Sequence, residues 1–317
     1  NFMETKLTMM LGIQFPVIMA PMFLVSNVAM VKSAIEGGIT GVIPALNFRN
    51  DQDFRLALDE LKSTNKPYGI NLIVNRSNYK LPQQLKTCLE YQVPFIITSL
   101  GSPSSVIAAC RPLGIKVFCD VSDMEYAHKA AALRPDALIA VNNQAGGHCG
   151  ILKPEDFIPQ LTKAFPDIPI ISAGGVGNAE GIKKMLSLGA CGVSVGTPFI
   201  ASVESPVSVE YKNACVEYSS KDIVKTTKLS GVPCTVINTP YVQKIGTRQN
   251  WLERILSQNK TLKKWFKILV YRQGMNKLSK AAFSASYQNV WCAGPTIDFI
   301  HDILPVKEII HRMVKGL

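Results

Sequence analysis

The sequence predicts an α/β fold, and within that class a (β/α)8 TIM barrel with a mostly helical insertion near the C-terminus. Short apolar or β-branched runs recur eight times between residues 15 and 196, and helix-like stretches separate them. A doubly wound sheet has about six strands, whereas eight strand–helix units make a closed barrel. The glycine-rich segment 174–177 also lies too late in the chain for a dinucleotide-binding fingerprint.

The eight predicted strands are residues 15–20, 40–44, 68–74, 95–99, 116–121, 137–142, 168–173 and 192–196. The first connecting helix is expected over 25–37, because Val28, Val31 and Ala34 share one helical face and Gly37 supplies a stop. Comparable helices are expected over 51–63, 82–91, 104–111, 124–133, 154–165 and 179–188.

Composition supports a soluble protein with a full core. The chain has 317 residues, 47% of them hydrophobic, and its longest apolar runs are much shorter than the roughly 20 residues of a membrane helix. We therefore expect a cytoplasmic protein. Asn1 and Phe2 precede Met3 and are left out of the predicted fold as foreign residues.

Eight cysteines are scattered without a Cys-x-x-Cys pair, which argues against a zinc ribbon, an iron–sulfur cluster and a disulfide framework. No metal site is expected. Cys149 follows His148 directly, and we interpret it as a packing residue because no base and orienting group accompany it in the sequence.

The positive charge is concentrated in one segment. Residues 216–285 contain ten Lys and three Arg against Glu217, Asp222 and Glu253, a net charge of +10 out of +11 for the whole chain. We assign 3–215 and 286–317 to the barrel and 216–285 to an insertion over its mouth. The best helix of the insertion is predicted over 251–271, with an interruption near Asn259.

Two interpretations of the insertion remain open. Its lysines form a solvated surface over ordinary core packing, or they form a docking face for an acidic protein partner. Because no nucleic-acid module or membrane span is recognisable, neither nucleic acid nor a membrane is an expected partner.

The loops after strands seven and eight predict a phosphate site. Barrel enzymes carry their chemistry at the C-terminal strand ends, and these two loops often bind phosphate there. Glycines bring bare backbone N–H groups close to an anion, next to a helix that begins near Ala179. The candidate residues are Ala173, Gly174, Gly175, Val195, Gly196 and Thr197.

Strands one and three end in residues suited to a flat ring. Pro21 fixes the backbone between the small Ala20 and the flexible Met22. Asn71 is a polar side chain in an apolar run, and its amide could meet the edge of an isoalloxazine ring or make a structural hydrogen bond.

Strand six leads into the candidate catalytic loop. Gln144, Gly146 and Gly147 precede His148, and the small residues let the backbone pass close to a ligand while the imidazole points into the mouth. A histidine with an ordinary pKa of about 6.5 suits general-base work or anion stabilisation near neutral pH. The other three histidines lie in helix-like surroundings.

In order and spacing, four segments resemble the nitronate monooxygenase family, formerly called 2-nitropropane dioxygenases. They are residues 19–22, 145–148, 172–175 and 196–199, and the resemblance covers nearly the whole chain. It implies non-covalent FMN, a small anionic nitronate as substrate and O2 as oxidant, with His148 as the catalytic residue. It also implies that the phosphate lies on Gly174, Gly175, Gly196 and Thr197, and the ring near Ala20, Met22, Asn71 and Gly146.

The chain departs from this family at two positions. Val141 and Gln144 stand where relatives commonly carry a Gln and an acidic residue. Two alternatives to nitronate oxidation therefore stay open. One is an NAD(P)H-dependent flavin reductase, such as enoyl-acyl-carrier-protein reductase II or a quinone reductase. The other, disfavoured because the segment has no recognisable nucleic-acid module, makes the basic insertion the functional element, as a binder of nucleic acid or acidic membrane.

Overall fold

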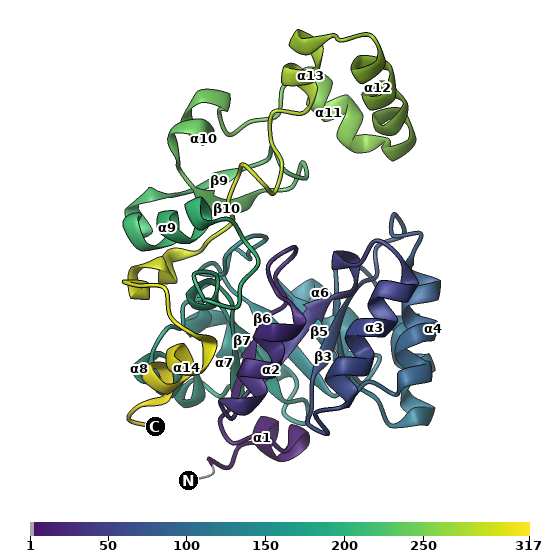
Figure 1. Ribbon diagram of the computed structural model, residues 1–317. Coiled ribbons are helices and arrows are strands. Elements are labelled where there is room, and N and C mark those ends of the chain that lie inside the picture. The colour runs from purple at the N-terminus through teal and green to yellow at the C-terminus, as the bar shows by residue number, and fades with distance from the viewer. Residues whose placement is uncertain (1–2) are drawn as a thin grey trace.

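The computed structural model describes residues 3–317, so Asn1 and Phe2 lie outside the described residues. Eight parallel strands pair in chain order and close into a barrel (Figure 1), which confirms the predicted TIM barrel. Every strand begins and ends within two residues of its predicted limits. The strands are β1 Val17–Met19, β2 Thr40–Pro44, β3 Gly69–Ile73, β4 Phe95–Ser99, β5 Lys116–Val121, β6 Ala137–Val141, β7 Ile170–Ala173 and β8 Gly192–Val195.

Helices cover the outside of the barrel, as predicted. They are α2 Val28–Glu36, α3 Asp51–Lys62, α4 Leu81–Tyr91, α5 Ser104–Cys110, α6 Met124–Ala131, α7 Pro154–Ala164 and α8 Ala179–Ser187. Short 3-10 turns follow several strands and helices: η1 Ala45–Asn47, η2 Arg111–Leu113, η3 Thr197–Phe199, η4 Ser220–Asp222 and η5 Pro295–Phe299. The last helix, α14 Val306–Val314, packs against α2. None of the helices in residues 3–317 has both the length and the apolar character needed to cross a bilayer.

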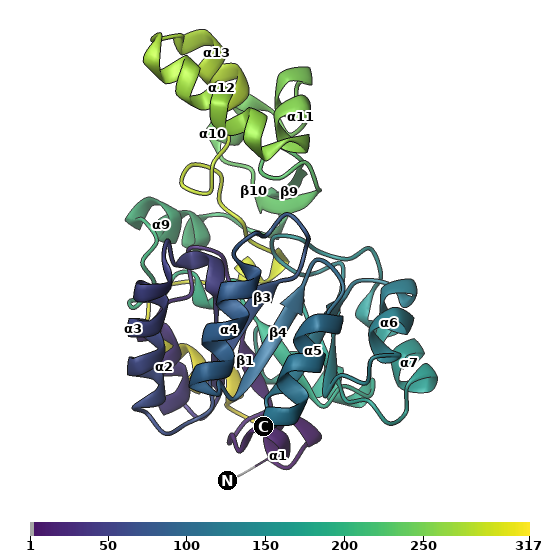
Figure 2. The same ribbon diagram turned by 90° about the vertical axis from the view of Figure 1, so that its right-hand side faces the viewer.

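The bottom of the barrel is closed by α1 Lys6–Leu11, a helix that the sequence patterns did not reveal. Thr5 caps it with a reciprocal capping box, and Leu7 and Leu11 join the residues that fill the barrel interior. Helix α1 and the C-terminal end of the chain lie on this side of the barrel in Figures 1 and 2.

Alternate strand residues face the barrel interior, because side chains of a strand alternate between its two faces. Phe95 of β4 and Phe118 of β5 both point inward and stack at 5.1 Å between ring centroids. Inward positions in the C-terminal parts of β3, β4 and β5 include three polar residues instead, Asn71, Ser99 and Asp120. The apolar interior therefore ends in a polar layer at the mouth, by which we mean the C-terminal end of the strands.

The insertion contains a β-hairpin as well as helices. Strands β9 Ile223–Thr226 and β10 Cys234–Ile237 pair antiparallel. The helices in and around this segment are α9 Val209–Glu217, α10 Pro240–Ile245, α11 Trp251–Gln258, α12 Lys260–Arg272 and α13 Asn276–Ala282. Asn259 ends α11 and caps α12, which confirms the predicted interruption. Figures 1 and 2 show the hairpin above the mouth and α11 to α13 beyond it, farthest from the barrel.

Candidate active site

The loop after β7 offers unpaired backbone donors. Gly174 and Gly175 adopt positive φ angles of 112° and 80°, a region that favours glycine. Within residues 3–317, the N–H groups of Gly174, Gly175 and Gly177 donate no hydrogen bond to another group. Asn178 then caps α8 by accepting the N–H of Gly181. Free N–H groups in front of a helix N-terminus form a binding site for a phosphate.

The loop after β8 meets the end of β1. A side chain at Gly196 would touch Met22 Sδ at 3.3 Å and the Ala20 methyl at 3.6 Å, and Ala20 N–H donates to the Val195 carbonyl at 2.8 Å. The buried Ser26 shapes this first loop, because its hydroxyl accepts the Met22 N–H and donates to the Ala20 carbonyl. The predicted residues of strands one and eight are therefore neighbours.

Asn142 ties the catalytic loop to the glycine loop. This residue is only 1% exposed, and its side-chain N–H donates to the Gly174 carbonyl at 3.1 Å. Its side-chain oxygen accepts the Gln144 N–H at 2.9 Å, and its carbonyl accepts the Gly150 N–H. One buried amide thus holds both ends of the loop that carries His148.

The middle of the catalytic loop packs on the loop after β8. A side chain at Gly146 would lie 2.8 Å from Thr197 Oγ1 and 2.9 Å from Gly294 N, so only glycine fits there. Thr197 is buried, and its hydroxyl accepts the Gly294 N–H at 2.9 Å. Gly294, in the segment that returns from the insertion, therefore packs against both Gly146 and Thr197.

His148 is held from the insertion. Its Nε2 lies 2.9 Å from Ser230 Oγ, in the turn between β9 and β10. Burial lowers the pKa of His148 below its ordinary value, so the imidazole is neutral at pH 7. In the described part of the chain Nδ1 has no partner, which leaves it for a ligand.

The hairpin joins the catalytic loop through the backbone. Thr235 N–H donates to the Gly147 carbonyl at 2.8 Å, and Thr235 Oγ1 donates to the Ala145 carbonyl at 3.1 Å. Cys149, next to His148, is half-buried, and burial raises the pKa of its thiol although Lys225 opposes the shift. A protonated thiol is a poor nucleophile, which agrees with the interpretation of Cys149 as a packing residue.

Three polar side chains form a chain across the mouth. Asn71 Nδ2 donates to Ser99 Oγ at 2.9 Å and to the Ile97 carbonyl at 3.0 Å, and Ser99 Oγ donates to Asp120 Oδ2 at 2.5 Å. Burial raises the pKa of Asp120 to about 6, opposed only by the hydrogen bond from Ser99. A carboxyl group that titrates near neutral pH therefore lies among the strand ends.

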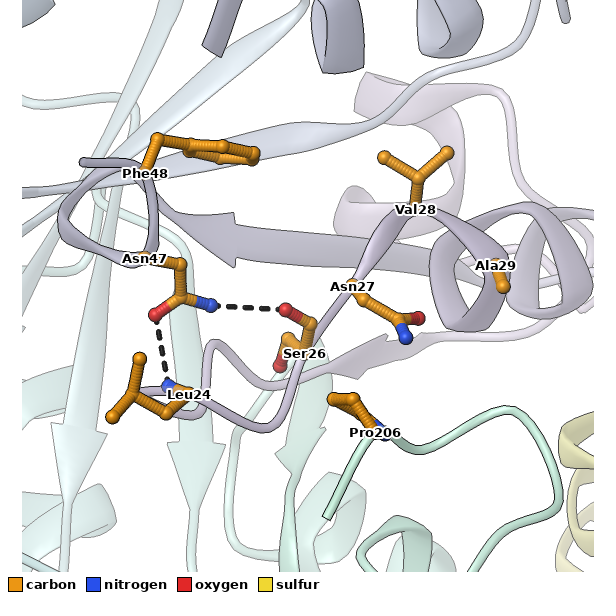
Figure 3. A pocket seen from close by; sticks show the side chains of 8 residues that line it. All are labelled: Leu24, Ser26, Asn27, Val28, Ala29, Asn47, Phe48 and Pro206. Carbon is orange, nitrogen blue, oxygen red and sulfur yellow. Dashed lines mark hydrogen bonds between the residues drawn. The ribbon is translucent and has the colours of Figure 1, made fainter. Parts of the chain in front are cut away.

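A hollow of about 440 Å3 lies beside the first loop and is lined by Leu24, Ser26, Asn27, Val28, Ala29, Asn47, Phe48 and Pro206 (Figure 3). Asn47 crosses it, accepting the Leu24 N–H and donating to the Ser26 carbonyl. None of the predicted site residues lines this hollow, and its lining carries no ionisable side chain. We therefore place the candidate chemistry at the mouth.

The surface of the insertion is cationic and partly apolar. Glu253 is the only acidic residue from 223 to 297, and it is buried in an ion pair with Lys228 at 2.7 Å. Exposed apolar side chains on α11 to α13 include Trp251, Ile255, Leu262, Trp265, Ile268, Leu269, Tyr271 and Leu278. An acidic partner for this surface remains a prediction.

The predicted site residues all come from loops or strand ends at the mouth, and their assignment to a cofactor remains a prediction. Sequence reasoning missed Asn142, Ser99, Asp120, Ser230 and Gly294. Asp120 was detectable as the only acidic residue in the eight barrel strands, and Asn142 as a polar residue at a strand end. Ser230 and Gly294 carry no local signal, because they lie far along the chain from the loop that they contact.

Comparison with known proteins finds one matching protein family and several similar proteins. A family model described as nitronate monooxygenase matches residues 76–316. The (3aS,4S,5R,7aS)-5-hydroxy-7a-methyl-1-oxo-octahydro-1H-indene-4-carboxyl-CoA dehydrogenase of Rhodococcus jostii is 27% identical over 244 residues, covering 77% of this chain and 68% of that protein. A nitronate monooxygenase of Pseudomonas aeruginosa is 26% identical over 275 residues, covering 72% of this chain and 78% of that protein.

A solved structure, that of FabK from Thermotoga maritima, matches with a TM-score of 0.81 and 28% identity, covering 99% of this chain and 96% of that one. The match spans both the barrel and residues 216–285. Similarity of the fold therefore extends through the insertion.

Proposed function

This chain belongs to the nitronate monooxygenase family, and on that premise we propose that it is an FMN-dependent enzyme that oxidises alkyl nitronates with O2. Membership makes it an oxidoreductase of a flavin-dependent family. The choice of FMN and of a nitronate as substrate is our proposal, supported by the residues at the mouth.

The mouth fits FMN. The free N–H groups of Gly174, Gly175 and Gly177 and the N-terminus of α8 suit its phosphate. Gly146 leaves backbone exposed where a side chain would collide with Thr197 and Gly294, and a side chain at Gly196 would contact Met22 and Ala20. Ala20, Pro21, Met22 and Asn71 would then border the ring, and Gln144, Gly147, Ala173, Val195 and Thr197 would complete the surrounding loops.

FMN would supply the redox chemistry by taking electrons from the substrate and passing them to O2. His148 would bind and orient the substrate anion through the Nδ1 side of its ring while Ser230 holds Nε2. With a neutral nitroalkane, the same neutral imidazole would accept the proton on the α-carbon. The insertion hairpin would exclude bulk water from this side of the mouth.

The observation that carries the proposal is that Asn142 ties the loop of His148, itself held by Ser230, to the β7 loop with its free amides. Purified protein should therefore show a flavin absorbance spectrum and consume O2 with propionate 3-nitronate. The His148→Ala variant should keep FMN and lose most turnover. Protein that holds FMN but consumes no O2 with alkyl nitronates would rule out the proposed substrate.

A second candidate is NAD(P)H-dependent reduction of an acyl thioester or a quinone. Similarity to a carboxyl-CoA dehydrogenase, together with the cationic insertion, favours a phosphate-bearing thioester. Anaerobic mixing with NADH or NADPH separates the two functions. Rapid bleaching of the flavin would support the reductase, whereas a flavin that stays oxidised would support nitronate oxidation.

A further inference from the structure

Asp120 is the only acidic residue in the eight barrel strands, and it lies at the inward position nearest the end of β5. In β5 the side chain two residues before it, Phe118, fills the barrel interior. Asp120 therefore lies at the mouth side of the apolar residues that fill the barrel interior, next to Asn71 and Ser99. A carboxylate in that layer faces whatever ligand occupies the mouth.

The carboxylate of Asp120 lowers the stability of the folded protein. Burial raises its pKa, and no Lys, Arg or His pairs with it in residues 3–317. Its single side-chain partner is the hydroxyl of Ser99. A partly buried, unpaired acid destabilises a fold, and such groups concentrate where they serve a ligand.

The direction of the hydrogen bonds is fixed by chemistry. The Ile97 carbonyl can only accept, so the Asn71 group that faces it must be the Nδ2 donor. The same Nδ2 donates to Ser99 Oγ, and the Ser99 O–H is therefore free to donate to Asp120. Asn71 Oδ1 is left without a partner in the described residues, as an acceptor for a donor outside the chain.

We propose that Asp120 is a positioning residue of the flavin site, which fixes the amide of Asn71 through Ser99 and places a negative charge at the floor of the mouth. The inference rests on the proposed binding of FMN there. Asn71 Oδ1 would accept the single ring N–H of an oxidised isoalloxazine. The negative charge of Asp120 makes the addition of electrons to that ring less favourable.

The charge and the hydrogen bonds can be separated by two variants. Asp120→Asn keeps an acceptor for Ser99 but removes the charge, whereas Ser99→Ala keeps the charge but breaks the chain to Asn71. Asp123→Asn is the matched control, because it makes the same charge change at the N-cap of α6, where Asn caps as well as Asp.

The measurements are the FMN dissociation constant of each apoprotein and the midpoint potential of bound FMN at pH 7.5. Asp120→Asn should bind FMN within about threefold of wild type and shift its reduction equilibrium about tenfold towards the reduced form, about 30 mV for two electrons. Ser99→Ala should weaken FMN binding about tenfold. Asp123→Asn should change neither quantity.

The outcomes separate this inference from the proposed function. Wild-type protein that takes up no FMN would overturn both. Protein whose Asp120→Asn variant binds FMN at the wild-type potential would overturn the inference alone, and so would a Ser99→Ala variant with wild-type affinity. A shift in potential only in Asp120→Asn, with weakened binding only in Ser99→Ala, would establish both parts of the role.

Discussion

Ser230 Oγ lies 2.9 Å from His148 Nε2, although 82 residues separate the two in the chain. The barrel supplies the histidine, and the insertion supplies the group that orients it. The orientation depends on the hairpin staying attached to the catalytic loop, which the bond from Thr235 N–H to the Gly147 carbonyl secures.

Replacing Ser230 with Ala should lower turnover by up to about 100-fold while FMN stays bound, because a misplaced imidazole loses alignment with the reacting carbon. Steady-state O2 consumption and the flavin spectrum measure the two effects. Ser257→Ala is the matched control in the same insertion, since that hydroxyl donates only within its own helix to the Arg254 carbonyl. Equal activity in both variants would show that Ser230 does not orient His148.

Replacing Gly174 with Ala should abolish tight FMN binding. A methyl group there would collide with Asn142 Oδ1, and the φ of 112° strains any L side chain. Fluorescence titration of the apoprotein with FMN should show at least a tenfold loss of affinity. Gly246→Ala also has a positive φ but open space around it, so it should cost on the order of 1–3 kcal/mol of stability through backbone strain alone and leave FMN affinity unchanged. Similar FMN affinities in the two variants would contradict the phosphate assignment.

Replacing Glu253 with Gln should destabilise the insertion. The Lys228–Glu253 pair is almost completely buried, and removal of the carboxylate leaves an unpaired ammonium at a cost of about 3 kcal/mol. Hydrogen exchange across α11 to α13 should accelerate while the barrel strands stay protected. Glu125→Gln breaks an exposed pair with Lys129 and should have no measurable effect. Unchanged exchange in Glu253→Gln would show that this pair does not stabilise the insertion.

The raised pKa of Asp120 predicts a pH dependence of stability. In the unfolded chain this carboxyl titrates near 3.8, and in the folded protein near 6. The folded state therefore binds the extra proton between these values, and stability falls as pH rises from about 4 to about 6. Urea unfolding of the apoprotein should show a loss on the order of 2 kcal/mol relative to Asp120→Asn over this range. Parallel pH profiles for the two proteins would contradict the shift.

The barrel was predictable because each strand is a compact apolar run followed by an amphipathic helix. The interruption at Asn259 was predictable as well, since an Asn both ends one apolar period and caps the next. The hairpin was not, because β9 has four residues and Lys225 breaks its apolar pattern. Its strand β10 also bridges to Gly147, which lies far away in the chain.

Within the candidate site, the glycine loops followed from their position after strands seven and eight. Ser230 could not be found in this way, because only the folded insertion brings it to His148. Asp120 could have been found by the test applied to Asn71, a polar residue in an otherwise apolar strand. Its burial, and the chain of bonds to Asn71, required the structure.

The hairpin meets the catalytic loop through the backbone of Thr235 and the side chains of Thr235 and Ser230. Such a junction tolerates sequence change at turn residues that make none of these contacts, while the glycine loops of the barrel remain under steric constraint. Substitutions at those turn residues can therefore change the surface above the mouth without disturbing the glycine loops of the barrel. Within residues 227–233, Ser230 and Lys228 must be kept for His148 and for the buried pair, whereas Val232 is exposed. A library randomised at Val232 and Pro233 therefore tests whether this turn influences substrate selectivity.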